Sequence, residues 1–338
     1  MQMRVLSDAG IEVSAVGFGV WTVSTGMWGI HDEEFGKKLL RRSLELGINF
    51  YDTADVYGDG KGETILADAF EGRRDEIVIG TKFGYDFYNH PGIQPNQRER
   101  PHDWSPAFIQ RACEESLRRL RTDRIDFYML HNPRMDALES DDIFETLDSL
   151  KAAGKIRAYG AALGPALKAD RQVEEGVYSV EHRQMAVQII YNMLEQVLGE
   201  GIFPAARKNN SPVLVRVPHA SGILEGTYTE ETQFGANDHR SHRVSTDEMR
   251  KKWLLDGLKK VEKLRFAAEE SGRTLGQMAI QFILSEPCIG ALFPNIYDEK
   301  QLEEFAAATD TPAFTAEELK QVSELYLNNF NLEAGIAA

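Results

Sequence analysis

Four ionisable residues stand at or just past the ends of consecutive predicted strands, and their types suit proton transfer to an oxygen atom. They are Asp52, Tyr57, Lys82 and His131. A carbonyl group that accepts a hydride develops negative charge on its oxygen and needs a proton. A tyrosine holds its proton at neutral pH and gives it up more readily beside an ammonium group, which favours the phenolate. Lys82 would supply that charge, Asp52 would hold the ammonium in place, and a neutral His131 would donate a hydrogen bond that orients the carbonyl.

Each of these residues also has an ordinary structural explanation when it is taken alone. An aspartate after a strand is more often a helix cap or a turn residue, and a lysine at a strand end is more often solvated. A histidine before Asn-Pro is more often a satisfied loop residue. Their order along the chain and their places at successive strand ends favour a shared site.

Short apolar runs alternate with longer amphipathic runs along the chain. The apolar runs predict strands at Val16–Trp21, Asn49–Asp55, Glu76–Gly84, Arg124–Asn132, Ile156–Leu163, Ala186–Asn192, Pro212–Val217 and Cys288–Pro294. Helical periodicity is clear in Glu33–Leu46, Pro106–Arg121, Phe144–Ala153 and Thr274–Leu284. Strands that alternate with helices and are buried on both faces predict an α/β fold, a (β/α)8 TIM barrel. The carboxyl ends of barrel strands share one face, so the four residues would converge there.

The chain is longer than the roughly 250 residues of a simple barrel, and the surplus has identifiable places. Residues Met3–Ser14 predict an N-terminal β-hairpin around Asp-Ala-Gly that would plug the bottom of the barrel. Two long loops, Gly84–Trp104 and Pro218–Thr246, are expected on the top face. Thr315–Leu327 predicts an extra C-terminal helix. No linker divides the sequence, so we expect one domain over residues 1–338.

Composition narrows the class of partner. The formal net charge is -15, from 53 acidic and 38 basic residues, and such a surface repels nucleic-acid phosphates and anionic lipid. Only Cys113 and Cys288 are present, which fits a reducing compartment rather than a disulfide framework. The first ten residues lack a secretory signal pattern, and no apolar run approaches the roughly 20 residues that span a bilayer. We therefore expect a cytoplasmic protein that binds neither nucleic acid nor membrane.

Several motifs together resemble the aldo-keto reductase family over almost the whole length, from about Arg4 to Glu304. The motifs are Val16-Gly-Phe-Gly-Val-Trp21, Gly47-Ile-Asn-Phe-Tyr-Asp-Thr-Ala-Asp-Val-Tyr-Gly58, Thr81-Lys-Phe-Gly84, Ser116-Leu-Arg-Arg-Leu120 before Ile125-Asp-Phe-Tyr-Met-Leu-His131, Gly154-Lys-Ile-Arg157 and Gln188-Ile-Ile-Tyr-Asn192. The resemblance implies a barrel that binds a nicotinamide dinucleotide across its top. By position, Tyr57 matches the proton donor, Asp52 and Lys82 match its tuning pair, and His131 matches the orienting residue.

The expected cofactor contacts match the family only in part. Gln188 matches the glutamine that family members place on the nicotinamide carboxamide, whereas the usual Ser-Asn after the fifth strand is replaced by Gly160-Ala-Ala-Leu-Gly164. Where the family often stacks an aromatic ring on the nicotinamide, this chain has Arg216. Its guanidinium plane would stack there too, or it would be a salt-bridged barrel residue.

The segment after the eighth strand departs furthest from the family. Members that prefer NADP usually place lysine or arginine against the 2′-phosphate, whereas this chain has Asn295 and Gln301 there, with Asp298 and Glu299 between them. Amide and acidic groups suit ribose hydroxyls better than a phosphate dianion. Both NAD and NADP stay open, with a lean to NAD. Lys300 or Arg240 is the alternative source of positive charge.

Two residues are candidates for the substrate pocket. Trp21 matches an aromatic that lines the pocket in the family, with a core tryptophan as the alternative. His219, on the predicted loop after the seventh strand, is the candidate polar contact with substrate. We expect no metal, because His239 and His242 are the only histidine pair with suggestive spacing and too few partners accompany them.

These features favour an oxidoreductase that acts on an aldehyde or ketone, or on the corresponding alcohol or sugar. A different class stays open: a cofactor-sensing interaction subunit on the same barrel, as in the channel β-subunits of the family, with little or no turnover. A barrel isomerase or lyase is a third possibility, and it would need no nicotinamide site.

Overall fold

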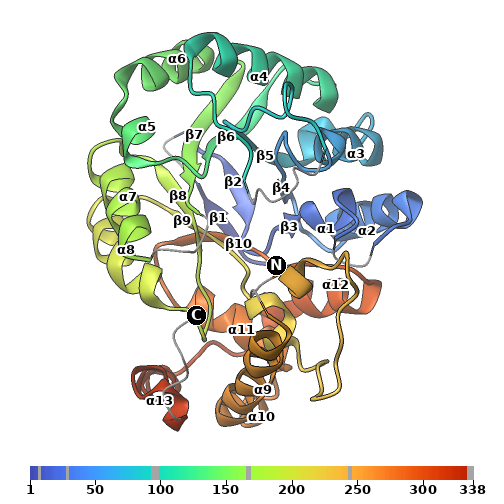
Figure 1. Cartoon of the computed structure of the whole chain (residues 1–338), viewed down its shortest axis with the longest axis vertical. Helices are drawn as coiled ribbons and strands as arrows, with labels where there is room; N and C mark the ends of the chain where they lie inside the picture. The colour runs from blue at the N-terminus through green and yellow to red at the C-terminus, as the bar shows by residue number, and fades with distance from the viewer. Residues whose placement is uncertain (7–8, 28–29, 93–98, 165–168, 243–245, 333–338) are drawn as a thin grey trace.

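A ring of parallel strands surrounded by helices is visible in the computed structural model, which describes residues 1–6, 9–27, 30–92, 99–164, 169–242 and 246–332 (Figure 1). Parallel pairs join neighbouring strands in chain order from β3 to β10. The strands are β3 (Phe18–Gly19), β4 (Phe50–Asp52), β5 (Val78–Phe83), β6 (Ile125–His131), β7 (Ile156–Ala162), β8 (Ala186–Ile190), β9 (Val213–Arg216) and β10 (Ile289–Phe293). The eight predicted strands and the (β/α)8 barrel are therefore confirmed.

The ring closes between the segment before β3 and the last strand. Gly17 N donates to Leu292 O at 2.8 Å, and Leu292 N donates to Ala15 O at 2.9 Å. Gly17 is required there, because a Cβ atom would lie 2.6 Å from the Phe293 ring and 2.9 Å from the carbonyl oxygen of Phe50. Closure satisfies the backbone of both edge strands.

Helices form the outer layer and follow the predicted periodicity. They are α1 (Trp21–Ser24), α2 (Glu33–Glu45), α3 (Lys61–Ala69), α4 (Pro106–Leu120), α5 (Met135–Glu139), α6 (Asp141–Ala152), α7 (Ala169–Glu181), α8 (Val197–Lys208), α9 (Asp247–Leu264), α10 (Phe266–Glu269), α11 (Leu275–Leu284), α12 (Glu299–Ala306) and α13 (Ala316–Leu327). Sequence-coded caps fix several starts: Ser105 caps α4 before Pro106, and Thr315 forms a capping box with Glu318 at α13. The predicted C-terminal helix is thus confirmed.

The predicted N-terminal hairpin is present and fills the bottom of the barrel. Strands β1 (Met3–Val5) and β2 (Glu12–Ser14) pair antiparallel. Leu6, Ile11 and Val13 are fully buried and belong to one apolar cluster with inward-facing residues of the barrel strands. The hairpin therefore takes the place of a solvated barrel floor.

Two expectations about local structure were wrong in detail. The first barrel strand ends before Trp21, which instead begins α1, because Val20 already has helical backbone angles. The predicted loop Pro218–Thr246 contains two 3-10 helices, η2 (Ala220–Glu225) and η3 (His239–His242). The described part of Gly84–Trp104 has no helix or strand. It contains one isolated antiparallel bridge, between Tyr85 and His102, and a turn at residues 87–89.

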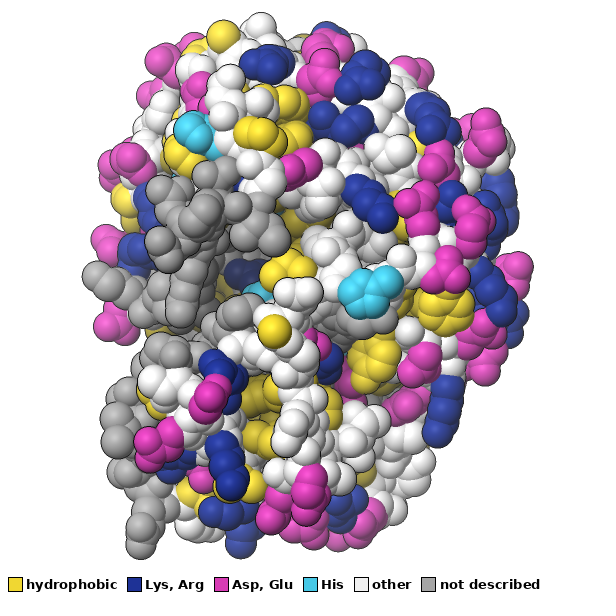
Figure 2. Space-filling view, turned by 45° about the vertical axis from the view of Figure 1, so that its right-hand side comes forward, with side chains coloured by type: hydrophobic (Ala, Val, Ile, Leu, Met, Phe, Trp, Pro, Cys, Tyr) yellow, Lys and Arg dark blue, Asp and Glu magenta, His cyan; other side chains and the backbone are white. Residues whose placement is uncertain are grey.

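The surface carries mixed charge despite the acidic total. Acidic and basic side chains are interspersed over the face in Figure 2. Among the described residues, no helix is long and apolar enough to cross a membrane.

We predict that the hairpin plug contributes strongly to stability. Leu6→Ala should lower the free energy of unfolding by about 2–5 kcal/mol, because it leaves a cavity in the barrel floor. Val5, its neighbour, is 62% exposed, so Val5→Ala should change the same quantity by no more than about 0.5 kcal/mol. Urea unfolding of both variants checks the prediction, and equal midpoints would contradict it.

Candidate active site

The four residues singled out by their spacing come together at the carboxyl ends of three neighbouring strands. Asp52 is the last residue of β4, Lys82 lies near the end of β5, and His131 is the last residue of β6. Tyr57 lies in the turn that leads from β4 to α3. Strands β4, β5 and β6 are adjacent in the ring, so the barrel brings these side chains to one edge.

A buried ion pair forms the base of the site. Lys82 Nζ donates to both carboxylate oxygens of Asp52, at 2.8 and 2.7 Å, and to the carbonyl oxygen of Thr53 at 2.7 Å. Lys82 is 1% exposed and Asp52 is 6% exposed. The ammonium has three donors, and these three acceptors use all of them. Its effect on other groups is therefore exerted through charge.

Gln188 ties this pair to the opposite side of the barrel. It lies on β8 with no exposed surface, and its Nε2 donates to Asp52 Oδ1 at 2.9 Å. The carboxylate needs a donor, which fixes the amide orientation and leaves Oε1 as the outward atom. Gln188 Oε1 is buried and has no hydrogen-bond partner among the described residues. An orphaned buried acceptor fits a ligand that carries an N–H group, such as a carboxamide.

Tyr57 is half-buried beside the ion pair. The Lys82 ammonium lies 5.1 Å from the centre of its ring, and the ring meets the imidazole of His131 edge-on at 5.8 Å. Its backbone is held by the turn, since its N–H donates to Ala54 O and its carbonyl accepts from Gly62 N. No hydrogen bond within the described part of the chain uses the Tyr57 hydroxyl, so this group is available to a ligand.

His131 is held in the neutral form. Burial lowers the pKa of His131 well below its usual range, and the positive charges of Lys82 and Arg216 act in the same direction. Its Nδ1 is buried without a partner among the described residues. A neutral imidazole keeps one N–H donor and adds no positive charge, which suits the orientation of a carbonyl oxygen.

A second tyrosine, which sequence reasoning missed, also touches His131. The ring of Tyr85 meets the imidazole edge-on at 4.9 Å. Its hydroxyl donates to Glu99 Oε1 and accepts from Asn132 Nδ2, each at 2.7 Å. Burial and the neighbouring Glu99 raise the pKa of Tyr85. Its hydroxyl is therefore committed to a structural network, unlike that of Tyr57.

Arg216, at the end of β9, forms no ion pair with a described carboxylate, although the charges of Asp52 and Glu195 act on it. Its Nη2 donates to Leu163 O at 2.8 Å. No Asp or Glu oxygen of the described residues lies within 4.0 Å of its guanidinium, so the salt-bridged alternative is wrong. Burial lowers the pKa of Arg216, yet a guanidinium stays protonated at neutral pH.

The candidate substrate contact His219 does not face the mouth of the barrel. It is 3% exposed, its ring stacks on Phe305 at 4.3 Å, and its Nε2 lies 3.0 Å from Gly276 O. The reason is the backbone: Ala220 and Ser221 have left-handed angles that turn the chain inward. Burial lowers the pKa of His219 to about 4, so the ring is neutral.

Gln301 is likewise engaged within the protein. It lies on the first turn of α12, where its backbone N–H donates to Oδ1 of the N-cap residue Asp298 at 2.7 Å. Its Nε2 donates to Glu225 Oε2 at 2.9 Å. Glu299 forms an ion pair with Lys38 on the outer surface. Of the two predicted cofactor contacts in this segment, Gln301 is thus hydrogen-bonded to Glu225, whereas Asn295 is half-buried and unbonded among the described side chains. The role of both at the cofactor stays a prediction.

Glu225 is a buried acidic residue that the sequence analysis did not single out. It sits in the apolar stretch Ile223-Leu224-Glu225-Gly226 and is 3% exposed. Tyr297 and Gln301 both donate to its Oε2, whereas its Oε1 has no hydrogen-bond partner among the described residues and lies 3.9 Å from Nδ1 of the neutral His219. Burial raises the pKa of Glu225 to about 7.

The segment after β9 reaches across to the start of the barrel. His239, in η3, donates its backbone N–H to Met27 O, and its ring meets Trp21 edge-on at 5.3 Å. Trp21 is partly exposed, so the alternative of a core tryptophan is wrong. Arg240 is bound to Asp238 and to the hydroxyl of Tyr228, which leaves it committed to this segment.

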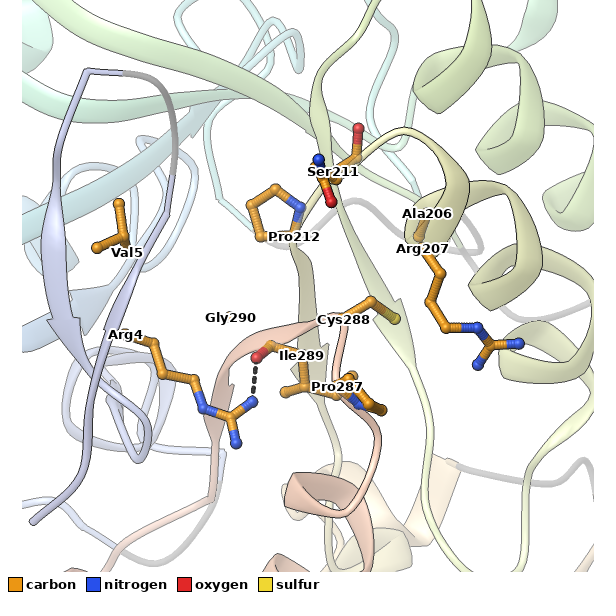
Figure 3. A pocket seen from close by; sticks show the side chains of 11 residues that line it. Arg4, Val5, Ala206, Arg207, Ser211, Pro212, Pro287, Cys288, Ile289 and Gly290 are labelled. Atoms are coloured by element: carbon orange, nitrogen blue, oxygen red, sulfur yellow. Dashed lines mark hydrogen bonds between the residues drawn. The ribbon is translucent and has the colours of Figure 1, made fainter.

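A separate cavity of about 540 Å³ lies at the amino-terminal end of β9 and β10 (Figure 3). Arg4 crosses it from β1 and donates to Ile289 O, with Pro212 and Cys288 on its walls. Barrel active sites lie at the other end of the strands, so this cavity is not the candidate site. The described residues contain no group of three or more His, Cys, Asp or Glu side chains that could hold a metal ion.

Comparisons with known proteins agree with this geometry. The model of the Aldo/keto reductase family matches residues 15–327. Aldo-keto reductase YhdN of Bacillus subtilis is 29% identical, covering 99% of this chain and 96% of that protein. Aldo-keto reductase yakc [NADP(+)] of Schizosaccharomyces pombe is 30% identical, covering 86% and 82%. The solved glycerol dehydrogenase AKR11B4 from Gluconobacter oxydans is 25% identical, with a TM-score of 0.79 and 99% of each chain covered.

We predict that the buried ion pair is coupled to folding. Lys82→Met should lower the free energy of unfolding by about 3–5 kcal/mol, because Asp52 is left buried without its cation. Adding Asp52→Asn should return part of that loss, because the neutral amide still offers an oxygen to Gln188. Urea unfolding of the single and double variants measures the difference. A double variant no more stable than Lys82→Met would show that the pair is not coupled.

Proposed function

Because the chain belongs to the aldo-keto reductase family, we propose that it transfers a hydride between a nicotinamide dinucleotide and an aldehyde or ketone, or the corresponding alcohol, with Tyr57 as proton donor. The observation that carries the proposal is the free Tyr57 hydroxyl beside a buried ammonium and a neutral imidazole. When bound, the dinucleotide supplies or accepts the hydride.

The chain's own residues would manage the proton and the charge. Tyr57 gives its proton to the carbonyl oxygen as negative charge develops there, and the Lys82 ammonium favours the phenolate that remains. Asp52 keeps the ammonium in place. The N–H of neutral His131 holds the carbonyl oxygen toward the tyrosine. In the reverse direction the phenolate takes the proton of an alcohol.

Two groups suit the carboxamide of the cofactor. Gln188 Oε1 is an orphaned acceptor for the amide N–H, and Arg216 has N–H donors beyond the one that binds Leu163. We propose that this pair replaces the Ser-Asn contact that the sequence lacks after β7. The name of the Gluconobacter relative adds glycerol as a substrate of that protein, so small hydroxyaldehydes and polyols come first in a substrate panel.

The choice between NAD and NADP is the finer part of the proposal. Before α12 lies the half-buried Asn295, and the cation in the first turn of α12 is the exposed Lys300, for which no described carboxylate lies within 4.0 Å. The buried Glu225 carboxylate accepts from Tyr297 and Gln301 in the same region. A carboxylate suits ribose hydroxyls and repels a 2′-phosphate. The name of the fission-yeast relative includes NADP(+), which argues the other way for that protein. We propose that this chain uses NAD(H) at least as well as NADP(H).

Tyr57→Phe tests the proton donor. Turnover with an aldehyde panel should fall by at least roughly a hundredfold, the usual scale of a lost general acid. Cofactor binding, followed by fluorescence, should persist, because the ring is retained. Tyr85→Phe is the matched control and should lose less than roughly tenfold, since its hydroxyl serves a structural network. Near-normal turnover by Tyr57→Phe would refute the assignment.

The same measurements separate the other classes of function. A wild-type protein that binds the dinucleotide without turning over any carbonyl or alcohol would be an interaction subunit. One that binds no dinucleotide would be a barrel enzyme of another kind.

Substitution of Glu225 and Asn295 tests the cofactor preference. Asn295→Lys and Glu225→Gln should each raise the catalytic efficiency with NADPH relative to NADH by roughly fivefold to tenfold, because each makes the region more positive. A wild-type preference of roughly tenfold for NADPH would contradict the proposal.

The preference should also depend on pH. The pKa of Glu225 is raised to about 7, so the carboxyl is largely neutral at pH 6 and ionised at pH 8. The wild-type efficiency ratio of NADPH to NADH should therefore fall across that range, and it should fall less in Glu225→Gln. Titration of the 2′-phosphate itself is common to both proteins and cancels in the comparison.

A further inference from the structure

Only one of the two cations at the reacting end of the site is held in a direct ion pair, and the second, Arg216, experiences the charges of Asp52 and Glu195 without described contact to either within 4.0 Å. Lys82 is matched by Asp52 in a hydrogen-bonded pair. Arg216 has no carboxylate within 4.0 Å among the described residues, and the rest of the chain contains only two acidic side chains, Asp8 and Glu333. His131 is neutral. A guanidinium that is partly desolvated and has no direct ion pair is costly to place in this wall, and its charge would act on a ligand bound beside it.

Several local contacts fix the position of the Arg216 guanidinium and of the turn that follows it. Its guanidinium donates to the carbonyl oxygen of Leu163 and lies over Gly164, where a Cβ atom would come within 2.6 Å of Nη2. The next residue, Val217, has a φ of 59°, a strained conformation for a β-branched side chain. Asn192 Nδ2 donates to the carbonyl oxygen of Val217 at 3.0 Å and holds this turn. Strain of this kind is maintained where the surroundings fix it.

Simple geometry brings this charge close to the nicotinamide. In the proposed reaction, the hydride goes to the carbon and the proton to the oxygen of a single carbonyl group. The nicotinamide ring must therefore lie within a few ångström of the groups around Tyr57. Arg216 is among those groups, because a Cβ atom at Gly164 would lie 2.6 Å from Arg216 Nη2 and 2.7 Å from Oδ1 of Asn132, the residue that follows His131. The charge of Arg216 accordingly acts on His131, and Tyr57 and Asp52 act on Arg216.

We propose that Arg216 makes this protein bind the reduced dinucleotide in preference to the oxidised one, a discrimination that rests on the proposed function. The oxidised nicotinamide ring carries a positive charge and the reduced ring carries none. Two like charges about 6 Å apart repel appreciably even at an effective dielectric constant of about 20. The Lys82 charge is directly paired with Asp52, whereas Glu195 and Asp52 act on Arg216 only from beyond 4.0 Å, so Arg216 is the less compensated of the two cations.

The preference has a direct consequence for the reaction on the enzyme. Reduced cofactor, carbonyl and the Tyr57 proton give oxidised cofactor, alcohol and phenolate, so the oxidised ring appears on the alcohol side. Tighter binding of the reduced form moves the bound equilibrium toward the carbonyl. Each tenfold of preference raises the reduction potential of the bound two-electron couple by about 30 mV.

Equilibrium titrations with NADH and NAD+, and with NADPH and NADP+, test the proposal without turnover. The wild-type protein should bind the reduced form at least roughly tenfold more tightly within each pair. Arg216→Met should tighten the oxidised form and reduce that ratio by roughly tenfold. Arg216→Lys keeps the charge and should keep most of the preference.

A matched control removes an equal charge from the other end of the barrel. Arg207→Met, an exposed residue paired with Glu286 near the amino ends of the strands, should leave the ratio unchanged. An unchanged ratio in Arg216→Met, or equal weakening of both forms, would overturn the proposal while leaving the proposed function intact. Failure of the wild-type protein to bind any of the four nucleotides would refute both.

Discussion

The burial of the Lys82 ammonium is the constraint on which the candidate site depends. A buried cation must have its charge and all its donors satisfied, and here one carboxylate and one backbone carbonyl do both. The acceptors are the last residue of β4 and the residue after it, the donor comes from β5, and Gln188 holds the carboxylate from β8. This requirement fixes three strands against one another across the barrel. It also explains why the ion pair leaves the neighbouring hydroxyl of Tyr57 unbonded and available.

The other electrostatic properties of the site follow from that pair and from Arg216. Both cations act on His131 in the same direction as its burial, so the imidazole stays neutral beside two positive charges. A neutral donor and a free hydroxyl then face the same space, while Tyr85 is withdrawn into its bonds with Glu99 and Asn132. In the proposed reaction, proton transfer and charge stabilisation would therefore fall to different residues.

The pattern of apolar and polar residues was sufficient to predict the barrel strands, but it did not predict the structure of the segment after β9. Strands and their ends follow from apolar runs and turn residues, and a barrel places all carboxyl ends on one face, so the convergence of Asp52, Lys82 and His131 was predictable. The region after β9 was not. Left-handed residues such as Ala220 and Ser221 reverse the chain, and they turn His219 into the core. Neither alternation nor helical period encodes that reversal.

The sequence pattern also did not predict the buried carboxylate of Glu225 or its hydrogen-bond partners. Glu225 lies in an apolar stretch whose pattern predicts only burial, and its partners Tyr297 and Gln301 come from a segment more than seventy residues later. An ionisable side chain in such a stretch is the one signal that could have drawn attention to it. The identity of its partners depends on how α12 docks, which local sequence does not determine.

The closure of the ring between Ala15–Gly17 and Leu292 affects how the protein is made. The first barrel strand emerges from the ribosome early, yet the strand that completes its hydrogen bonds comes near the end of the chain. Until then its outer edge is unpaired, a state prone to wrong association. Neighbouring strands β4 and β5 can bring Asp52 and Lys82 together during synthesis, whereas Gln188 and the closing strand arrive later. The strand that closes the ring is thus the last to be synthesised, and the exposed edge of the first strand is protected only once it arrives.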